Sequence, residues 1–400
     1  MAAKSGKNTH LEHLEDEIIN NGADGGDKAI NILKELGKYL SGLGGPGVAI
    51  TTKWDGAPAI VCGTDPADGK FFVGTKSVFN VNDPKMCKTQ SDVQRLYDGV
   101  LANKLSTCLR YLSKAGIKGV LQGDLMFTND KKQQTIQNRS YITFRPNTIT
   151  YAVEPNSPLG NEIQAAQIGI VFHTKYTGDS IANMKASFDV EDSDFRSGGA
   201  IWAQKATFED VTGQAGFTAQ EQVMYDNAVR RAEGSLKLAR GTANSIQSGG
   251  ATLDFDTEFK KFFNNYVKGG MNNPPVEQAY NEFAFHLGAE FDKNIMKLKT
   301  LQAQNAKAHR WVKMIEVMET NARGFKMLIA TYFNIQIAKN IVVNKLAQVK
   351  SLNMFVESGN DYKVTNPEGF VAITGQGAVK LIDRLEFSRL NFTVPKNFGR

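Results

Sequence analysis

A lysine stands at the end of an apolar segment near residue 50, and this position restricts the fold more than any other. Largely apolar residues 48–50 precede Lys53, and apolar residues 57–61 follow it. Burying an ammonium group is costly unless a carboxylate pairs with it or its proton is lost. The fold must therefore supply one of these environments, and a lysine that can lose its proton can serve as a nucleophile.

Lys53 begins the tetrapeptide Lys53-Trp54-Asp55-Gly56. Residues two apart on an extended chain project to the same side, so we expect Lys53 and Asp55 to lie side by side. Gly56 would allow the backbone to approach another segment closely. The pattern suits a catalytic lysine, and the alternative is a structural Lys–Asp pair at the end of a strand.

Short β segments dominate from residue 48 to residue 204. We predict strands at 48–52, 57–62 and 70–74 that pair as successive antiparallel strands, with turn residues before Gly69. From 205 to 360 the apolar spacing becomes helical, and from 361 to 400 it returns to strand character. With a helical segment at 1–47, the sequence predicts an α+β fold of antiparallel sheets and flanking helices, interrupted by a large helical insertion.

The composition favours a soluble protein of a reducing compartment. No apolar run approaches the roughly 20 residues needed to cross a membrane, and the N-terminus lacks the apolar region of a signal peptide. The three cysteines, Cys62, Cys87 and Cys108, show no Cys-x-x-Cys spacing. We therefore expect a cytoplasmic protein with reduced thiols and no membrane partner, and the sequence does not indicate an oligomeric state.

Positive charge is concentrated in the helical insertion. Residues 296–350 contain ten basic residues against two acidic ones, a net charge of +8 in a chain whose total is +6. A concentrated positive face favours a polyanion such as nucleic acid, and Lys313, Arg323 and Lys326 are the candidate contacts. The alternative is a solvated helix face that is rich in lysine.

Three further charged residues lie in apolar segments typical of strands. Asp124 ends the segment 119–125, Glu368 begins the segment 368–373, and Lys380 lies within 378–382. Together with Lys53, they make two lysines and two acids in apolar surroundings. Such a set indicates a pocket that binds a charged ligand and a metal ion.

These segments resemble the motifs of the covalent nucleotidyltransferase superfamily, which contains ATP-dependent DNA ligases, RNA ligases and mRNA capping enzymes. The matching segments are Lys53–Gly56 (motif I), Thr75-Lys76-Ser77 (the basic motif downstream), 121–125 (motif III, with Asp124 where Glu is usual), 168–172 (the strand with the base-stacking aromatic), Glu368–Val371 (motif IV) and Val379–Leu381 (motif V). The resemblance covers 48–175 and 365–384, in the expected order. The whole chain also resembles uncharacterised proteins of tailed phages.

The sequence departs from the superfamily near its end. Asp383-Arg384 stands where motif V usually has a second lysine, and Arg384 is the candidate substitute. Sixteen residues follow Arg384, which leaves no room for the C-terminal OB-fold of DNA ligases and capping enzymes. Motif VI is therefore unassigned, and an RNA ligase is favoured over a DNA ligase.

The resemblance implies a mechanism. Lys53, within its Asp55-containing motif, would attack the α-phosphate of ATP and form a lysyl-AMP adduct. Lys380 would neutralise charge on the α-phosphate, Lys76 would contact the nucleotide, and Phe172 would stack on the adenine. Glu368 and Asp124 would hold Mg²⁺, which prefers oxygen ligands.

The AMP would then pass to a 5′-phosphate end, which a 3′-hydroxyl would seal in the host-cell cytoplasm if a phage encodes the protein. Three other functions stay open: a capping-type guanylyltransferase, a non-catalytic nucleic-acid-binding or phage structural protein on a degenerate nucleotidyltransferase scaffold, and an adenylyltransferase that acts on a protein or small molecule.

Overall fold

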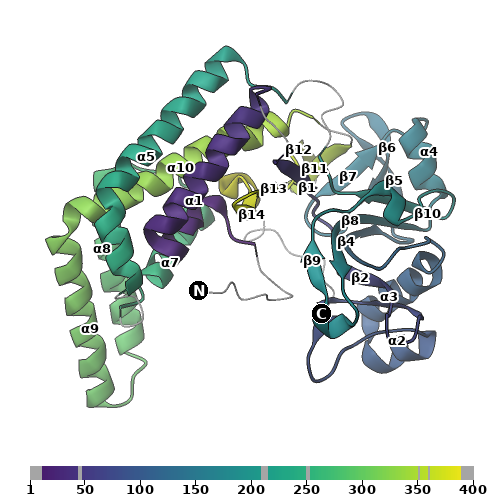
Figure 1. The fold of residues 1–400 in the computed structure, drawn as a ribbon, viewed down its shortest axis with the longest axis horizontal. Coiled ribbons are helices and arrows are strands. Elements are labelled where there is room, and N and C mark those ends of the chain that lie inside the picture. The colour runs from purple at the N-terminus through teal and green to yellow at the C-terminus, as the bar shows by residue number, and fades with distance from the viewer. Residues whose placement is uncertain are drawn as a thin grey trace.

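The computed structural model describes residues 11–43, 47–208, 215–248, 253–349, 352–358 and 361–388. A helical lobe and a β-rich lobe lie on either side of a small sheet (Figure 1). The predicted α+β class is confirmed, and the strands pair antiparallel with the exception of β8 and β10. The bounds of the 3₁₀ and π helices are η1 (Leu14–Asp16), η2 (Lys76–Phe79), η3 (Ile181–Asn183), η4 (Asp192–Asp194) and η5 (Arg384–Ser388).

The small central sheet has the order β1-β13-β14. Its strands are β1 (Ala49–Lys53), β13 (Gly369–Thr374) and β14 (Gly377–Leu381). Lys53 lies directly opposite Gly369, although they come from opposite ends of the chain. The prediction that 48–52 pairs with 57–62 is therefore wrong, because β1 pairs with β13 instead.

A six-stranded sheet forms the centre of the β-rich lobe. Its path is β10 (Ile201–Lys205), β8 (Ile168–Thr177), β4 (Val120–Phe127), β2 (Ala59–Thr64) and β3 (Phe71–Gly74), with β9 (Lys185–Ser187) on β8. The predicted pairing of 57–62 with 70–74 is confirmed by β2 and β3. Helices α2 (Gln90–Leu96) and α3 (Gly99–Leu112) pack their apolar residues against one face of this sheet.

A third sheet has the order β12-β11-β7-β6-β5. Its bounds are β5 (Lys132–Ile136), β6 (Arg139–Phe144), β7 (Thr150–Val153), β11 (Asn353–Ser358) and β12 (Asp361–Val364), and α4 (Pro158–Ala165) follows β7 in the chain. Strand β11 pairs with β7, so the chain returns to the sheets at Asn353, ahead of the boundary expected at 360.

The helical lobe has one continuous apolar core. Its helices are α1 (Glu17–Leu40), α5 (Ala219–Ser248), α7 (Phe255–Gly269), α8 (Val276–Ile295), α9 (Leu301–Thr320) and α10 (Ala322–Leu346). Helix α1 lies beside α5 and α10 (Figure 1) and contributes Ile32, Leu33 and Leu36 to their core. The N-terminal helical segment thus belongs to the same lobe as the insertion.

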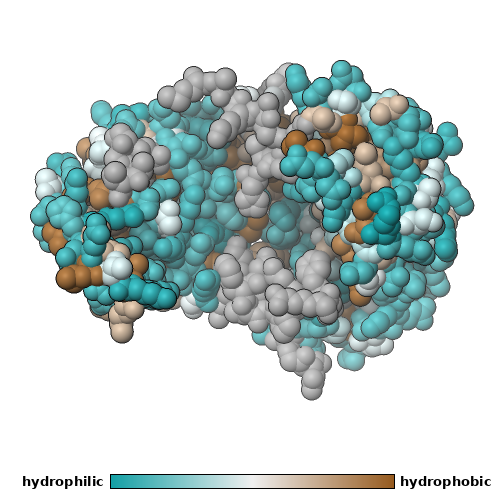
Figure 2. Space-filling view, turned by 90° about the horizontal axis from the view of Figure 1, so that it is seen from below, coloured by the Kyte–Doolittle hydropathy of each residue, from teal (hydrophilic) through white to brown (hydrophobic). Residues whose placement is uncertain are grey.

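The surface of the molecule is largely hydrophilic on the face that Figure 2 shows, with apolar residues scattered over both lobes. Among the described residues, no helix combines the length and apolar character that a membrane span requires.

Candidate functional site

A cavity open to solvent lies where the central sheet meets the six-stranded sheet. It has a volume of about 340 Å³ and is lined by Lys53, Lys76, Asp124 and Lys380, among other residues. The sequence predicts all four as site residues, and the fold brings them together at this cavity. The cavity is of the size that small-molecule sites require.

Lys53 reaches the cavity from the end of β1, and its Nζ contacts the Glu368 carboxylate in an ion pair across 315 residues of sequence. The pairing of Lys53 with Gly369 explains this contact, because Glu368 immediately precedes β13. A Cβ on Gly369 would lie 2.5 Å from the Leu381 carbonyl oxygen, so β14 can approach only a glycine there. The register of three short strands therefore positions Lys53 against Glu368.

Gly56 of the same motif also permits a close approach. A Cβ at this position would lie 2.5 Å from the Asp124 Cβ, which a real side chain would not tolerate. The predicted role of Gly56 in close packing is confirmed. Its absent side chain lets the loop after β1 lie against β4 and keeps Asp124 near Lys53.

The charges around Lys53 raise its pKa above the usual value. Burial alone lowers the pKa, but the Glu368 carboxylate outweighs this effect, and Asp124 and Asp55 add to it. Burial raises the pKa of Glu368, and the same two acids raise it further, while Lys53 lowers it. Three carboxylates around one lysine explain both directions.

Lys380 lines the same cavity from β14. Its backbone amide donates a 2.9 Å hydrogen bond to the carbonyl of Glu12, and its strand forms a parallel bridge to His13. Burial lowers the pKa of Lys380, and the positive charge of Lys53 lowers it further. The N-terminal segment thus supports the second lysine, and Leu11 lines the cavity itself.

Asp55 does not line the cavity beside Lys53, although its charge acts on Lys53. Strand β1 ends at Lys53, so the two-residue alternation does not extend to Asp55. The carboxylate is buried and accepts hydrogen bonds from Asn147 Nδ2 (2.7 Å) and from the backbone amides of Thr148 (2.6 Å) and Ile149 (2.7 Å). Asp55 thus anchors the loop before β7 and does not line the cavity, and its role in catalysis stays a prediction.

Phe172 is also not where the sequence predicts. It is fully buried on the far side of β8, with its ring centroid 5.0 Å from that of Phe195. Its neighbours Val171 and His173 line the cavity instead. The predicted stacking of Phe172 on a base is therefore wrong, and His173 is a cavity residue that the prediction did not include.

The cavity changes character along β4. Asp124 lies at the charged end, while Gln122, two residues away on the same strand face, lines a part with Tyr176 and Phe188. The Tyr176 hydroxyl donates a 2.8 Å hydrogen bond to Gln122 Oε1 and so fixes the amide. A cationic end and an uncharged, partly aromatic end suit a ligand with an anionic group and a ring.

Arg384 does not line the cavity. It is buried beside the helical lobe, where Nη1 lies 3.3 Å from Asp16 Oδ1 and donates a 2.9 Å hydrogen bond to the Tyr332 hydroxyl. These contacts raise the already high pKa of Arg384. It therefore does not replace the absent second lysine of motif V.

The positive charge of residues 296–350 is partly neutralised by acids that lie outside this range. The paired residues are Arg310 with Asp254, Lys326 with Glu277, Lys339 with Glu15 and Lys345 with Glu221. Lys313 and Arg323 of the predicted interface are exposed, whereas Lys326 is half-buried in its ion pair.

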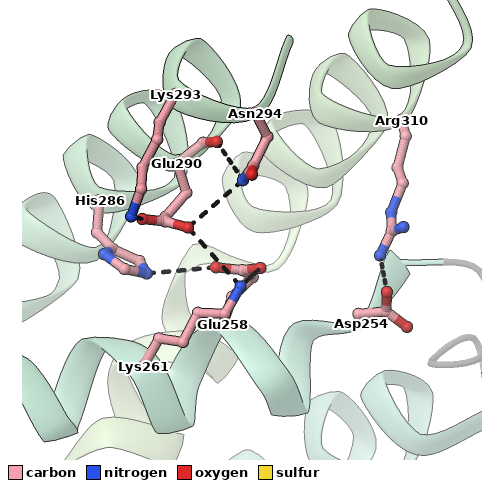
Figure 3. A network of polar contacts seen from close by, with 8 residues as sticks. All are labelled: Asp254, Glu258, Lys261, His286, Glu290, Lys293, Asn294 and Arg310. Atoms are coloured by element: carbon pink, nitrogen blue, oxygen red, sulfur yellow. Dashed lines mark hydrogen bonds and ion pairs between the residues drawn. The ribbon is translucent and has the colours of Figure 1, made fainter. Parts of the chain in front are cut away.

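A network of polar contacts joins the outer helices of this lobe (Figure 3). Glu258 of α7 lies 3.3 Å from His286 Nε2 of α8, and Lys261 lies between Glu258 and Glu290. Arg310 of α9 reaches Asp254 beside this network. The charges here join helices to one another, so the sequence count of +8 overstates the field that an external polyanion would meet.

Residues 8–396 match the model of a family that is described as "Family of unknown function (DUF6267)". Neither a curated protein nor a solved structure matches the chain. The family description assigns no reaction, so a function has to be argued from the cavity.

Proposed function

We propose that this chain, which belongs to the DUF6267 family, is an ATP-dependent polynucleotide ligase of the RNA-ligase type. The observation that carries the proposal is the contact between Lys53 and Glu368 at the wall of a cavity that Lys76 and Lys380 also line. A structural ion pair needs neither a cavity nor two further lysines. A nucleophilic lysine that receives a triphosphate needs both.

The first step would join Lys53 to AMP. The Nζ–phosphorus bond forms at the α-phosphate of ATP, the bond from that phosphorus to the bridging oxygen breaks, and pyrophosphate leaves with the electron pair. The proton that Nζ must lose passes to the Glu368 carboxylate, which already contacts it. Burial raises the pKa of Glu368, which makes it a better proton acceptor than an exposed carboxylate.

The other lysines would stabilise the phosphates. Lys380 is half-buried, and burial strengthens its attraction for an anion because water screens it less. Lys76 faces the cavity from η2, where the Thr75 side chain accepts a hydrogen bond from the backbone amide of Ser77 and so caps the helix start. The base would occupy the end lined by Gln122 and Tyr176.

A divalent metal ion, expected as Mg²⁺, fits one of the two predicted ligands better than the other. No described residue donates a hydrogen bond to the Asp124 carboxylate, so its oxygens are available at the cavity. Glu368 is engaged by Lys53. When bound, the ion would neutralise charge on the phosphates.

The second half of the reaction would transfer AMP to a 5′-phosphate end. An oxygen of that phosphate attacks the adenylyl phosphorus and releases Lys53, and a 3′-hydroxyl then displaces AMP to seal the strand. The exposed Lys313 and Arg323 of the helical lobe would bind the polynucleotide backbone. The protein would act in the cytoplasm, of the host cell if a phage encodes it.

A non-catalytic polynucleotide-binding protein on the same scaffold is the competing candidate. The position of Arg384 supports it, because the cavity then lacks the second cation that motif V usually supplies. A capping-type guanylyltransferase or another adenylyltransferase would share the first step and differ in nucleotide or acceptor.

Covalent labelling distinguishes these candidates. The full-length protein is incubated with Mg²⁺ and either ATP or GTP labelled at the α-phosphate, then denatured. We expect label from ATP in the wild type and in the control Lys70→Ala on the exposed β2–β3 turn, and none in Lys53→Ala. Labelling of Lys53→Ala, or of no variant with either nucleotide, contradicts the proposal; a preference for GTP indicates a guanylyltransferase.

A further inference from the structure

We propose that Asp124 and His173 together hold a divalent metal ion, and that this pair prefers Mn²⁺ to Mg²⁺. The inference deepens the proposed nucleotidyl transfer, because it replaces Glu368 by His173 among the metal ligands. It rests on how the two side chains face the cavity.

The two groups point at the same space. His173 Nε2 lies 3.8 Å from Asp124 Oδ1, too far for a hydrogen bond, and both side chains are about three-quarters buried. Adjacent ligands on one octahedral ion with bonds of about 2.1 Å lie about 3 Å apart, and opposite ligands about 4.2 Å apart. The observed separation lies between these values, so a small side-chain rotation admits an ion between them.

The imidazole ring is already oriented for a metal. Its Nδ1 lies 2.8 Å from Thr174 Oγ1, a hydrogen bond that fixes the ring plane. When Nδ1 donates its proton to Thr174, Nε2 presents a lone pair to the cavity. Metal-binding histidines commonly use their second nitrogen in this way. Val171 and His173 are two residues apart on β8 and both line the cavity, whereas Phe172 between them stays in the core.

Glu368 is less suited to the ion than Asp124. Its carboxylate is in contact with Lys53, and a cation would have to displace an ammonium group that lies against it. No described residue donates a hydrogen bond to the carboxylate of Asp124. With Lys53 and Glu368 neutralising one another, Asp124 presents the negative charge that faces His173.

The ligand chemistry decides the preference. The described residues provide no group of three metal-binding side chains, so the pair would supply two ligands, with water or phosphate oxygens completing the shell. A carboxylate suits both ions, but a nitrogen ligand is tolerated better by Mn²⁺ than by Mg²⁺. A nitrogen–oxygen pair therefore favours Mn²⁺.

The test is a titration of the full-length protein with Mn²⁺ alone, in which electron paramagnetic resonance reports free Mn²⁺. We expect one bound ion per chain and a loss of affinity of at least about tenfold in His173→Gln and in Asp124→Asn. The exposed control His309→Gln should bind within about twofold of the wild type, and Mg²⁺ should compete weakly. Circular dichroism confirms that each variant is folded.

Wild-type affinity in His173→Gln or in Asp124→Asn would overturn the assignment. Because no nucleotide is present, the result is independent of adduct formation. Mn²⁺ bound through His173 without any lysyl adduct retains this site and removes the ligase proposal. If an adduct forms on Lys53 but His173→Gln binds Mn²⁺ normally, the ligase proposal is retained and this metal site is removed.

Discussion

Replacing Lys339 by methionine should destabilise the helical lobe by about 3–5 kcal/mol, because the change leaves a buried charge without its partner. Lys339 of α10 and Glu15 of η1 are both fully buried, and Nζ donates a 2.6 Å hydrogen bond to Glu15 Oε1. Burial alone would raise the pKa of Glu15, but Lys339 outweighs it and holds the pKa below the usual value. The pair fastens the N-terminal segment to α10.

The double variant Glu15→Met/Lys339→Met separates the pair from the packing around it. An ion pair replaced by apolar side chains of similar volume is often neutral or stabilising, so we expect the double variant to recover most of the loss. The two single changes should therefore be strongly non-additive. Glu15→Met alone should be about as destabilising as Lys339→Met, since it also leaves one buried charge.

Urea unfolding followed by circular dichroism at 222 nm measures these differences, because the helical lobe dominates that signal. A single-variant loss below about 1 kcal/mol would refute the reasoning, as this is the range of an exposed pair. So would a double variant as unstable as the sum of the single changes. Either result would mean that the two charges do not depend on one another.

Three further predictions concern other parts of the molecule. Phe172→Ala should cost about 3–5 kcal/mol of stability in the same assay yet leave nucleotide labelling of the folded protein intact, because the ring lies in the core; lost labelling with normal stability would restore its role at the base. Burial lowers the pKa of His13 from 6.5 to about 3, so its contribution to stability is complete above pH 6.5 and is lost as the pH falls toward 3. His13→Gln should therefore flatten the decline in melting temperature between pH 7 and pH 4, and an unchanged decline would assign it to other groups. Lys313→Glu should weaken polynucleotide binding and lower its salt slope by at least about 1, and an unaltered slope would exclude this face of α9.

The members of the site could be predicted from the sequence better than its geometry. Lys53, Asp124, Glu368 and Lys380 each stand out as a charge in an apolar segment. The structure places three of them in the lining of one cavity, and Glu368 in contact with Lys53. The pairing of β1 with β13 could not be predicted, because strands so far apart carry no local turn signal.

The error at Phe172 has a specific cause. Residues 168–172 are apolar throughout, and a strand buried on both faces shows no alternation that would reveal which side chains face the cavity. His173 carried the available signal, a polar residue at the end of this apolar run. Asp124 is predicted as a site residue because it is a charged residue at the end of an apolar run, and the polar His173 occupies a similar position.

The charge count along the sequence overstated the positive charge of the insertion for a related reason. A count along the sequence excludes acids that the fold brings from elsewhere, and Glu15 and Glu221 lie outside the counted range. The exposed Lys313 and Arg323 are what remains of the predicted nucleic-acid interface.

The mass of the protein after incubation with ATP and Mg²⁺ tests the central claim most directly. The full-length chain is measured intact and then digested, and the modified peptide is sequenced. The proposed mechanism predicts a gain of one AMP on the peptide that contains Lys53, absent from Lys53→Ala and reversed by pyrophosphate. An unmodified protein, or AMP carried by a different residue while Lys53 stays free, would contradict it.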